Sequence, residues 1–247
     1  MYAGFGEFGM DVGAIARGVA IYALPVGMAI ILHEVAHGWV AEKFGDSTAR
    51  RAGRITLNPI SHIDPIGTIL LPIIQIIAFG RFFFGWAKPV PVNFAALRNP
   101  KRDMVWVAFA GPGTNFSLAL LSALLLRLIV FIDPNVWALA QDDIAPQVLR
   151  NFGAGASVLV PIAKMLNASI FINCALMVLN LIPVPPLDGG RIMVGLLPHE
   201  AAYKYSKIEP FGIFIIMLLI FVLPFTQAMF YGFIRAFVML FYMVALS

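Results

Sequence analysis

Long apolar runs separated by short polar segments dominate this chain. A helix needs about 20 apolar residues to cross the hydrocarbon core of a bilayer. Five runs are predicted to be membrane-spanning helices, at about residues 17–44, 103–132, 156–181, 210–224 and 228–246. The short separator Pro224-Phe-Thr-Gln227 predicts that the last two spans form an antiparallel pair. The pattern therefore indicates an all-α polytopic membrane protein.

The apolar run at residues 65–84 is ambiguous. Basic residues lie on both sides of it, including Arg54 before it and Lys88 after it, so the chain is expected to return to the side it left. We interpret it as a re-entrant element or a short span, giving five to six spans in all. The proline-rich segment 85–93 that follows has few free amide donors and is expected to be extended and β-like.

Composition supports a membrane protein. Of the 247 residues, 60% are hydrophobic and 12% are charged. The net charge of +4 fits basic cytoplasmic loops better than a nucleic-acid partner. The positive-inside rule places residues 43–65 in the cytoplasm and residues 133–154 on the opposite side. We expect no cleaved signal peptide, because the first apolar run also carries ionisable residues.

Those ionisable residues are the most unusual feature of the chain. The sequence His33-Glu-Val-Ala-His37 lies inside the first span, where each ionisable side chain costs roughly 2.5–3.5 kcal/mol on insertion scales. Positions i and i+4 share a helix face, so His33 and His37 can bind one metal ion. Glu34 then projects beside the open coordination position as a general base. This is the H-E-x-x-H pattern of zinc peptidases.

A third ligand is predicted at the end of a different span. Pro183, Pro185 and Pro186 break the helix before Asp188 and are expected to leave it on an irregular segment at membrane depth. Two histidines and one carboxylate, with water in the fourth position, make a catalytic rather than a structural zinc site. One Zn²⁺ ion per chain is therefore predicted.

Further motifs are candidates for substrate binding. In Gly111-Pro-Gly-Thr-Asn115, small residues permit close helix packing, and a packing role is at least as plausible as direct contact of Gly111 and Asn115 with substrate. Segment 85–93 is expected to offer an edge, with Val90, Val92 and Asn93, on which an unwound substrate lies. His62 is best interpreted as a loop histidine with a local hydrogen-bond partner.

Together these motifs resemble the site-2 protease family of intramembrane zinc metallopeptidases, in its compact bacterial form without a PDZ or other soluble domain. The resemblance runs from His33 to Arg191 and includes Asn180 with Asp188-Gly189. It implies one domain over residues 1–247, in the bacterial inner membrane, that cleaves single-span or other transmembrane proteins near the cytoplasmic leaflet. It also implies that Asn180 helps to hold the substrate or the transition state. The oligomeric state stays open.

Two other classes of function fit the sequence less well. A metal transporter can use intramembrane histidine and carboxylate ligands, but it has no need of Glu34 between two ligands on one helical turn. A catalytically silent membrane-binding module is disfavoured because the ligands and the base are all present.

Overall fold

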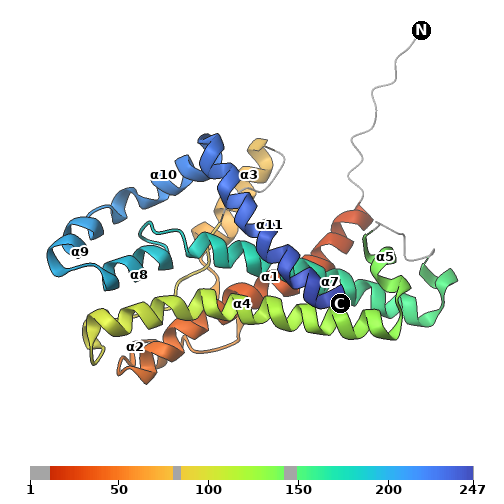
Figure 1. Ribbon diagram of the computed structural model, residues 1–247, viewed down its shortest axis with the longest axis horizontal. Helices are drawn as coiled ribbons and strands as arrows, with labels where there is room; N and C mark the ends of the chain where they lie inside the picture. Colours follow the sequence, from red (N-terminus) through yellow and green to blue (C-terminus); the bar gives the residue numbers. More distant parts are fainter. Residues whose placement is uncertain (1–11, 80–84, 142–148, 247) are drawn as a thin grey trace, which may run out of the picture.

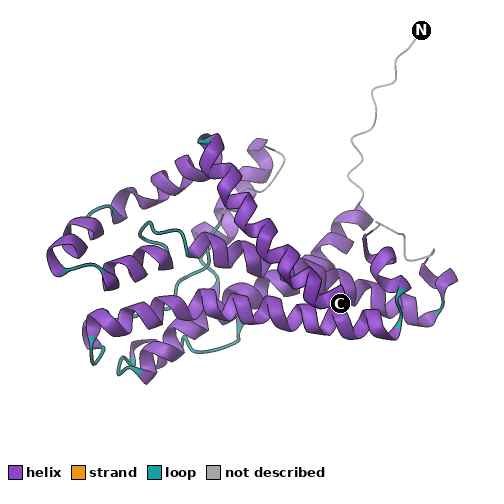
Figure 2. Cartoon of the chain, viewed as in Figure 1, coloured by secondary structure: helices purple, strands orange, loops and turns teal. Residues whose placement is uncertain are grey.

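The computed structural model describes residues 12–79, 85–141 and 149–246, and within them it contains helices and loops but no strand (Figures 1 and 2). The four longest helices are α1 (Val12–Lys43), α4 (Pro100–Ile132), α7 (Ala154–Asn180) and α11 (Pro224–Leu246). The shorter α-helices are α2 (Thr48–Arg51), α3 (Leu71–Phe79), α5 (Asn135–Gln141), α8 (Asp188–Leu196), α9 (His199–Ser206) and α10 (Gly212–Met217). Short 3₁₀ turns lie at η1 (Pro59–His62), η3 (Phe94–Ala96), η4 (Arg150–Phe152) and η5 (Glu209–Phe211), and π-helical turns at η2 (Pro65–Leu70) and η6 (Leu218–Val222).

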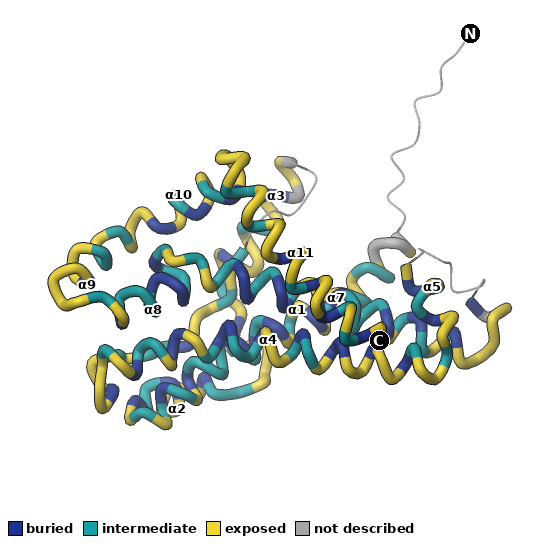
Figure 3. Tube along the Cα trace, viewed as in Figure 1, coloured by how far each residue is buried: buried dark blue, intermediate teal, exposed yellow. Residues whose placement is uncertain are grey.

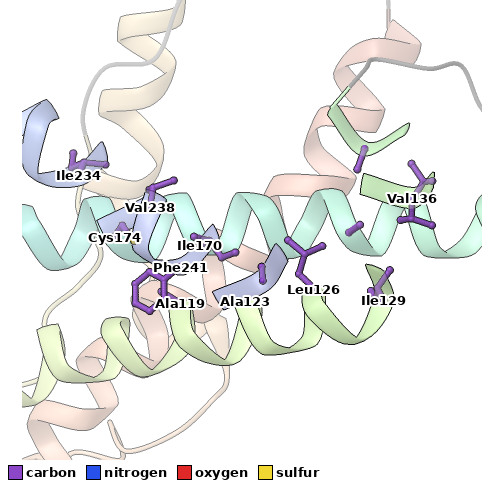
Figure 4. Close-up of a cluster of buried hydrophobic side chains, with 14 of the residues drawn as sticks. Ala119, Ala123, Leu126, Ile129, Val136, Ile170, Cys174, Ile234, Val238 and Phe241 are labelled. Atoms are coloured by element: carbon purple, nitrogen blue, oxygen red, sulfur yellow. The ribbon is translucent and has the colours of Figure 1, made fainter. Parts of the chain in front are cut away.

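Helices α1, α4 and α7 pack against one another, and α11 packs on α4 and α7. The main core lies along these contacts, where Ala119 and Ala123 of α4 are small and Phe241 of α11 lies beside Ala119 (Figure 4). Small residues at such positions let helix backbones approach closely, as is typical of membrane helix packing. The labelled core residues are Ala119, Ala123, Leu126, Ile129, Val136, Ile170, Cys174, Ile234, Val238 and Phe241.

The outer surface of the bundle is apolar. Figure 3 shows buried positions where the long helices face one another and exposed positions on the outer sides of α9, α10 and α11. Large side chains such as Phe131, Ile77 and Phe214 are at least 75% exposed, which suits contact with lipid rather than water. Five helical stretches among the described residues are long and apolar enough to cross a membrane: Ala16–Lys43, Pro100–Ile132, Ala154–Asn180, His199–Val222 and Pro224–Leu246. The prediction of an all-α polytopic membrane protein is confirmed.

The last two helical stretches are not packed as the expected antiparallel pair. Figure 1 shows α11 leading onward from the far end of α10 instead of folding back along it. Pro224 is the first residue of α11 rather than part of a connecting loop, a position that proline tolerates because its missing N–H has no partner there. The apolar face of α11 packs on α4 and α7, and this contact directs the helix away from α10.

The segment that was expected to be re-entrant begins as a helix. Residues Pro65–Phe79 are helical, residues 80–84 lie outside the described part, and the re-entrant path stays a prediction. Segment 85–93 forms no strand among the described residues. Instead, single hydrogen bonds hold it in place: Lys88 N–H donates to the His62 carbonyl at 2.9 Å, and the Arg54 guanidinium donates to the Lys88 carbonyl at 2.8 Å.

The polar segments gather at the two ends of the bundle. Figure 1 places α2, α8 and α9 at one end and α5 at the other. These are the ends that the charge pattern predicts to be cytoplasmic and non-cytoplasmic, respectively. His33 and His37 lie in the last third of α1, towards α2, and Asp188 begins α8, so all three lie towards the α2 and α8 end.

Candidate metal centre

Two histidines of α1 are held in place by hydrogen bonds to α4. His33 Nδ1 lies 2.6 Å from Oδ1 of Asn115, and His37 Nδ1 lies 2.7 Å from the carbonyl oxygen of Val107. Because both partners are oxygen acceptors, each Nδ1 carries the proton. Each Nε2 therefore presents a lone pair, and the two Nε2 atoms are 3.1 Å apart.

Asp188 reaches the same point from α8. The cis peptide Pro185–Pro186 lies in the turn after α7. The sequence predicted that Asp188 lies on an irregular segment, but it is the first residue of α8. A carboxylate is favourable in the first turn of a helix because of the helix dipole. Its Oδ2 atom lies 3.2 Å from His33 Nε2 and 3.3 Å from His37 Nε2. The sequence-predicted triad is thus brought together.

The spacing of these three atoms suits a metal ion. Zinc bonds of about 2.0–2.1 Å in tetrahedral geometry set neighbouring ligand atoms about 3.3 Å apart. Asp188 Oδ2 is buried and has no hydrogen-bond partner among the described residues. Without a cation, three lone-pair atoms would face one another in an apolar bundle, an arrangement that is costly. His33, His37 and Asp188 can therefore hold a metal ion together.

Gly111 of α4 provides the space for this cluster. A Cβ atom at this position would lie 2.5 Å from ring atoms of both His33 and His37. Any other residue would force the imidazoles to move. Gly111, which the sequence suggested for substrate contact or packing, thus lies directly against the predicted ligands.

Behind His33 lies a buried polar network that includes a residue not predicted from the sequence. Asn115 also donates its side-chain N–H groups to the Ala29 carbonyl at 3.2 Å and to Oδ1 of Asn173 at 2.8 Å. Asn173 in turn donates to the Ser169 carbonyl at 2.9 Å. Asn173 is 1% exposed within α7, and its only sequence signal was a polar amide in an apolar span.

Glu34 projects from a different face of α1. Its Oε2 accepts a hydrogen bond of 2.7 Å from the backbone N–H of Val90. The Val90 side chain is buried against Gly38, where an added Cβ would lie 2.8 Å from Val90 Cγ1. The backbone of segment 85–93 therefore orients the predicted base. The Val90 N–H group is already hydrogen-bonded to Glu34.

The other two residues of the predicted substrate edge also have structural contacts. Val92 packs against the small cluster of Ala41, Leu97 and Val107. Asn93 N–H donates to Asp46 Oδ2 at 2.6 Å, and its side chain accepts from Ala95 N–H at 3.1 Å. Roles for Val90, Val92 and Asn93 in substrate binding stay predictions.

Asp46 holds segment 85–93 to the end of α1. Burial alone would raise the pKa of this carboxyl group, but hydrogen bonds from Thr48 and Asn93 and the charge of Arg51 outweigh it and hold the pKa below its usual range. Asp46 is fully buried and accepts from the Thr48 backbone N–H at 2.9 Å. The charged carboxylate thus fixes the segment that orients Glu34.

Asn180 is not brought to the metal-ligand cluster by any described contact. Its side-chain amide donates to the Leu176 carbonyl one turn earlier in α7, at 3.0 Å. A role in transition-state binding stays a prediction for this residue.

Residues 21–223 match the sequence profile of Peptidase family M50. This chain belongs to peptidase family M50, the site-2 protease family. Among similar proteins, YwhC of Bacillus subtilis (strain 168), named as a zinc metalloprotease, is 38% identical over 78% of this chain and 76% of its own length. The zinc metalloproteases named Rip2 are more distant. The one from Mycolicibacterium smegmatis is 29% identical over 78% of this chain and 63% of its own length, and the one from Mycobacterium tuberculosis H37Rv is 27% identical over 83% and 68%. No solved structure matches the chain significantly.

Membership of family M50 identifies the enzyme class. The chain is a zinc metalloprotease of the site-2 type, and five apolar helices of membrane-spanning length make it a multi-pass membrane protein. The expected cofactor, zinc, is confirmed by the relatives and by the juxtaposition of His33, His37 and Asp188. The transporter and the silent module are thereby disfavoured.

Proposed function

We propose that this M50 protein is an intramembrane endopeptidase that hydrolyses peptide bonds in the transmembrane segments of single-span or other membrane proteins. The observation that carries the proposal is the position of the cluster: three metal-ligating atoms within 4.8 Å of one another, inside a bundle of membrane-spanning helices. A site at this depth is accessible to substrate segments that are themselves in the membrane.

The position of the cluster in the bundle also indicates where in the membrane cleavage takes place. Because Asp188 is the first residue of α8, the cluster lies towards the end of the bundle that carries α2, α8 and α9, which the positive-inside rule assigns to the cytoplasm. Cleavage is therefore proposed near the cytoplasmic leaflet. The similar proteins come from bacteria, which supports placement in the bacterial cytoplasmic membrane as part of a single domain over residues 1–247.

In this proposal each side chain has a distinct task. His33, His37 and Asp188 hold the zinc ion, while Asn115 and the Val107 carbonyl keep both imidazoles in the tautomer that leaves Nε2 free. A zinc ion bound there acts as a Lewis acid that makes water a nucleophile near neutral pH and polarises a carbonyl group. Glu34 takes a proton from the attacking water and delivers it to the leaving amine.

The substrate must also change shape before it can react. A transmembrane helix keeps its carbonyl groups in internal hydrogen bonds, so the scissile bond becomes accessible only after local unwinding. The irregular loops near Glu34, rather than the long helices, provide the part of the protein where such an unwound segment can be received.

The test is the substitution Glu34→Gln, which keeps the size of the side chain and removes the base. We expect the purified variant to keep one zinc ion per chain and to lose cleavage of a co-expressed single-span substrate by a factor of about 100 or more. Measured zinc content and immunoblots of the substrate report the two results separately. Proteolysis at the wild-type rate would exclude Glu34 as the base.

A further inference from the structure

Two side-chain amides are buried together where α4 packs on α7. Asn115 is 0% exposed and Asn173 is 1% exposed, and Asn115 Nδ2 donates to Asn173 Oδ1 at 2.8 Å. Burying an amide in an apolar bundle is costly unless it is hydrogen-bonded. Hydrogen bonds between membrane helices add little net stability, so helix packing alone is a weak reason for a pair of amides here.

Backbone carbonyl groups fix the direction in which this pair donates and accepts. Asn173 Nδ2 lies 2.9 Å from the Ser169 carbonyl oxygen. Asn115 Nδ2 lies 3.2 Å from the Ala29 carbonyl oxygen. Because a carbonyl oxygen only accepts, both amide NH₂ groups must point to these sides. Asn173 therefore presents its oxygen to Asn115, and Asn115 presents its own oxygen to His33 Nδ1.

The opposite orientation of the Asn115 amide would work against metal binding. Its NH₂ group would then face His33 Nδ1 and favour the tautomer with the proton on Nε2. Nε2 is the atom of His33 that lies 3.2 Å from Asp188 Oδ2, and it needs a free lone pair to bind zinc. The turned amide is disfavoured because its oxygen would face two other acceptors, the Ala29 carbonyl and the Asn173 oxygen.

We propose that Asn173 is a positioning residue for the zinc site. It holds the Asn115 amide in the direction that requires the His33 proton on Nδ1 and leaves Nε2 free for the metal. Asn173 acts through Asn115, since its described hydrogen bonds include Asn115 and none of the three predicted ligands. The inference rests on the proposed role of His33 as a zinc ligand and does not depend on which peptide is cleaved.

Two substitutions of Asn173 separate this role from helix packing. Asn173→Leu keeps roughly the volume of the side chain but removes the acceptor for Asn115. Asn173→Asp keeps an acceptor oxygen, and in its protonated form it also donates to the Ser169 carbonyl, so it reproduces both hydrogen bonds. Competition between the purified full chain and a zinc chelator in detergent gives the zinc affinity of each variant. Melting temperatures measured without zinc report on packing.

We expect Asn173→Leu to weaken zinc binding about tenfold, as is typical when a contact that orients a ligand is lost. Asn173→Asp should bind zinc nearly as tightly as the wild type. A packing role predicts the reverse order, because leucine suits an apolar helix contact and a buried carboxyl group does not. Wild-type zinc affinity in Asn173→Leu would overturn the proposal.

Asn167→Leu is the matched control. It removes another amide of α7, one that accepts a hydrogen bond from the Tyr242 hydroxyl group. Because this pair is separate from the hydrogen bonds that lead to His33, zinc affinity should stay at the wild-type value. A loss equal to that of Asn173→Leu would mean that any change in α7 packing weakens the site, and would overturn the proposal.

A double-mutant cycle tests the route through Asn115, even where Asn173→Leu alone is poorly stable. Combining it with Asn115→Leu replaces both amides, and replacing both partners of a hydrogen bond by apolar groups can be nearly neutral for stability. Once Asn115 is replaced, Asn173→Leu should have no further effect on zinc affinity. Additive losses would overturn the proposal. Cleavage by the wild type is assayed separately, and its absence would refute the peptidase function, whereas the zinc affinities alone decide the role of Asn173.

Discussion

The two functional faces of α1 differ in how tightly they are held. On the face towards α4, His33 and His37 each have a hydrogen-bond partner on Nδ1, and Gly111 lets both rings approach the neighbouring helix. On the other face, Glu34 has one described hydrogen bond, from the Val90 backbone N–H. The difference indicates that the metal-binding face is fixed by helix packing, while the base lies under loops that a substrate can approach.

Among the variants that test this difference, Gly111→Ala is expected to have the largest effect on activity and zinc content. The new Cβ would overlap both imidazoles, so activity should fall by about 100-fold or more and zinc content should fall with it. Gly113→Ala is the matched control, because its Cβ would approach only Phe109, at 3.4 Å. Normal zinc binding by Gly111→Ala would show that the metal-binding face is less tightly packed than described.

Asn115→Ala should have the next largest effect, because it removes the partner of His33 Nδ1. Loss of such an orienting contact typically weakens metal affinity or activity by about 10–100-fold. The measurement is a competition titration with a zinc chelator. Ser117→Ala serves as a control, since Ser117 is exposed and donates only to the Gly113 carbonyl in its own helix.

Val90→Pro tests the face of α1 that carries Glu34. It removes the N–H group that Glu34 accepts from, so kcat should fall about tenfold while zinc content stays constant. Val90→Ala retains the N–H group and controls for the loss of side-chain packing. If Val90→Pro lost zinc instead, the two faces of α1 would not be independent.

Asp46→Asn is expected to have the smallest effect and to depend on pH. Because the folded-state pKa of Asp46 is lowered, its charged form stabilises the fold at neutral pH, and this contribution is lost as pH falls through the folded-state value. The melting temperatures of wild type and variant should therefore differ most near pH 7. They should converge below the ordinary aspartate pKa of about 3.9. A constant difference across this range would contradict the role assigned to the Asp46 charge.

Much of the fold could be predicted because a helix that crosses a lipid bilayer needs a long run of apolar residues. The long apolar runs correspond to α1, α4 and α7 to within a few residues at each end. The relative direction of α10 and α11 could not be predicted in this way. It depends on which buried surface accepts the apolar face of α11, and hydropathy along the chain carries no information about that surface.

The metal-ligand candidates were also predictable, because His33, His37 and Asp188 are chemically conspicuous in apolar surroundings. The residues that orient these ligands were harder to predict. Asn115 had a candidate role in substrate contact or packing but lies behind His33. Asn173 was not predicted at all, although the argument that a polar residue in a membrane span needs a partner applies to it equally. A partner 58 positions away in the sequence becomes visible only when the helices are placed together.

His33, His37 and Asp188 are expected to bind one zinc ion together. X-ray absorption at the zinc edge of the purified protein tests it most directly. We expect a first shell of about four nitrogen or oxygen atoms at about 2.0–2.1 Å, with the outer-shell scattering of two imidazoles. A sulfur ligand at about 2.3 Å, or a spectrum without two imidazoles, would contradict the assignment.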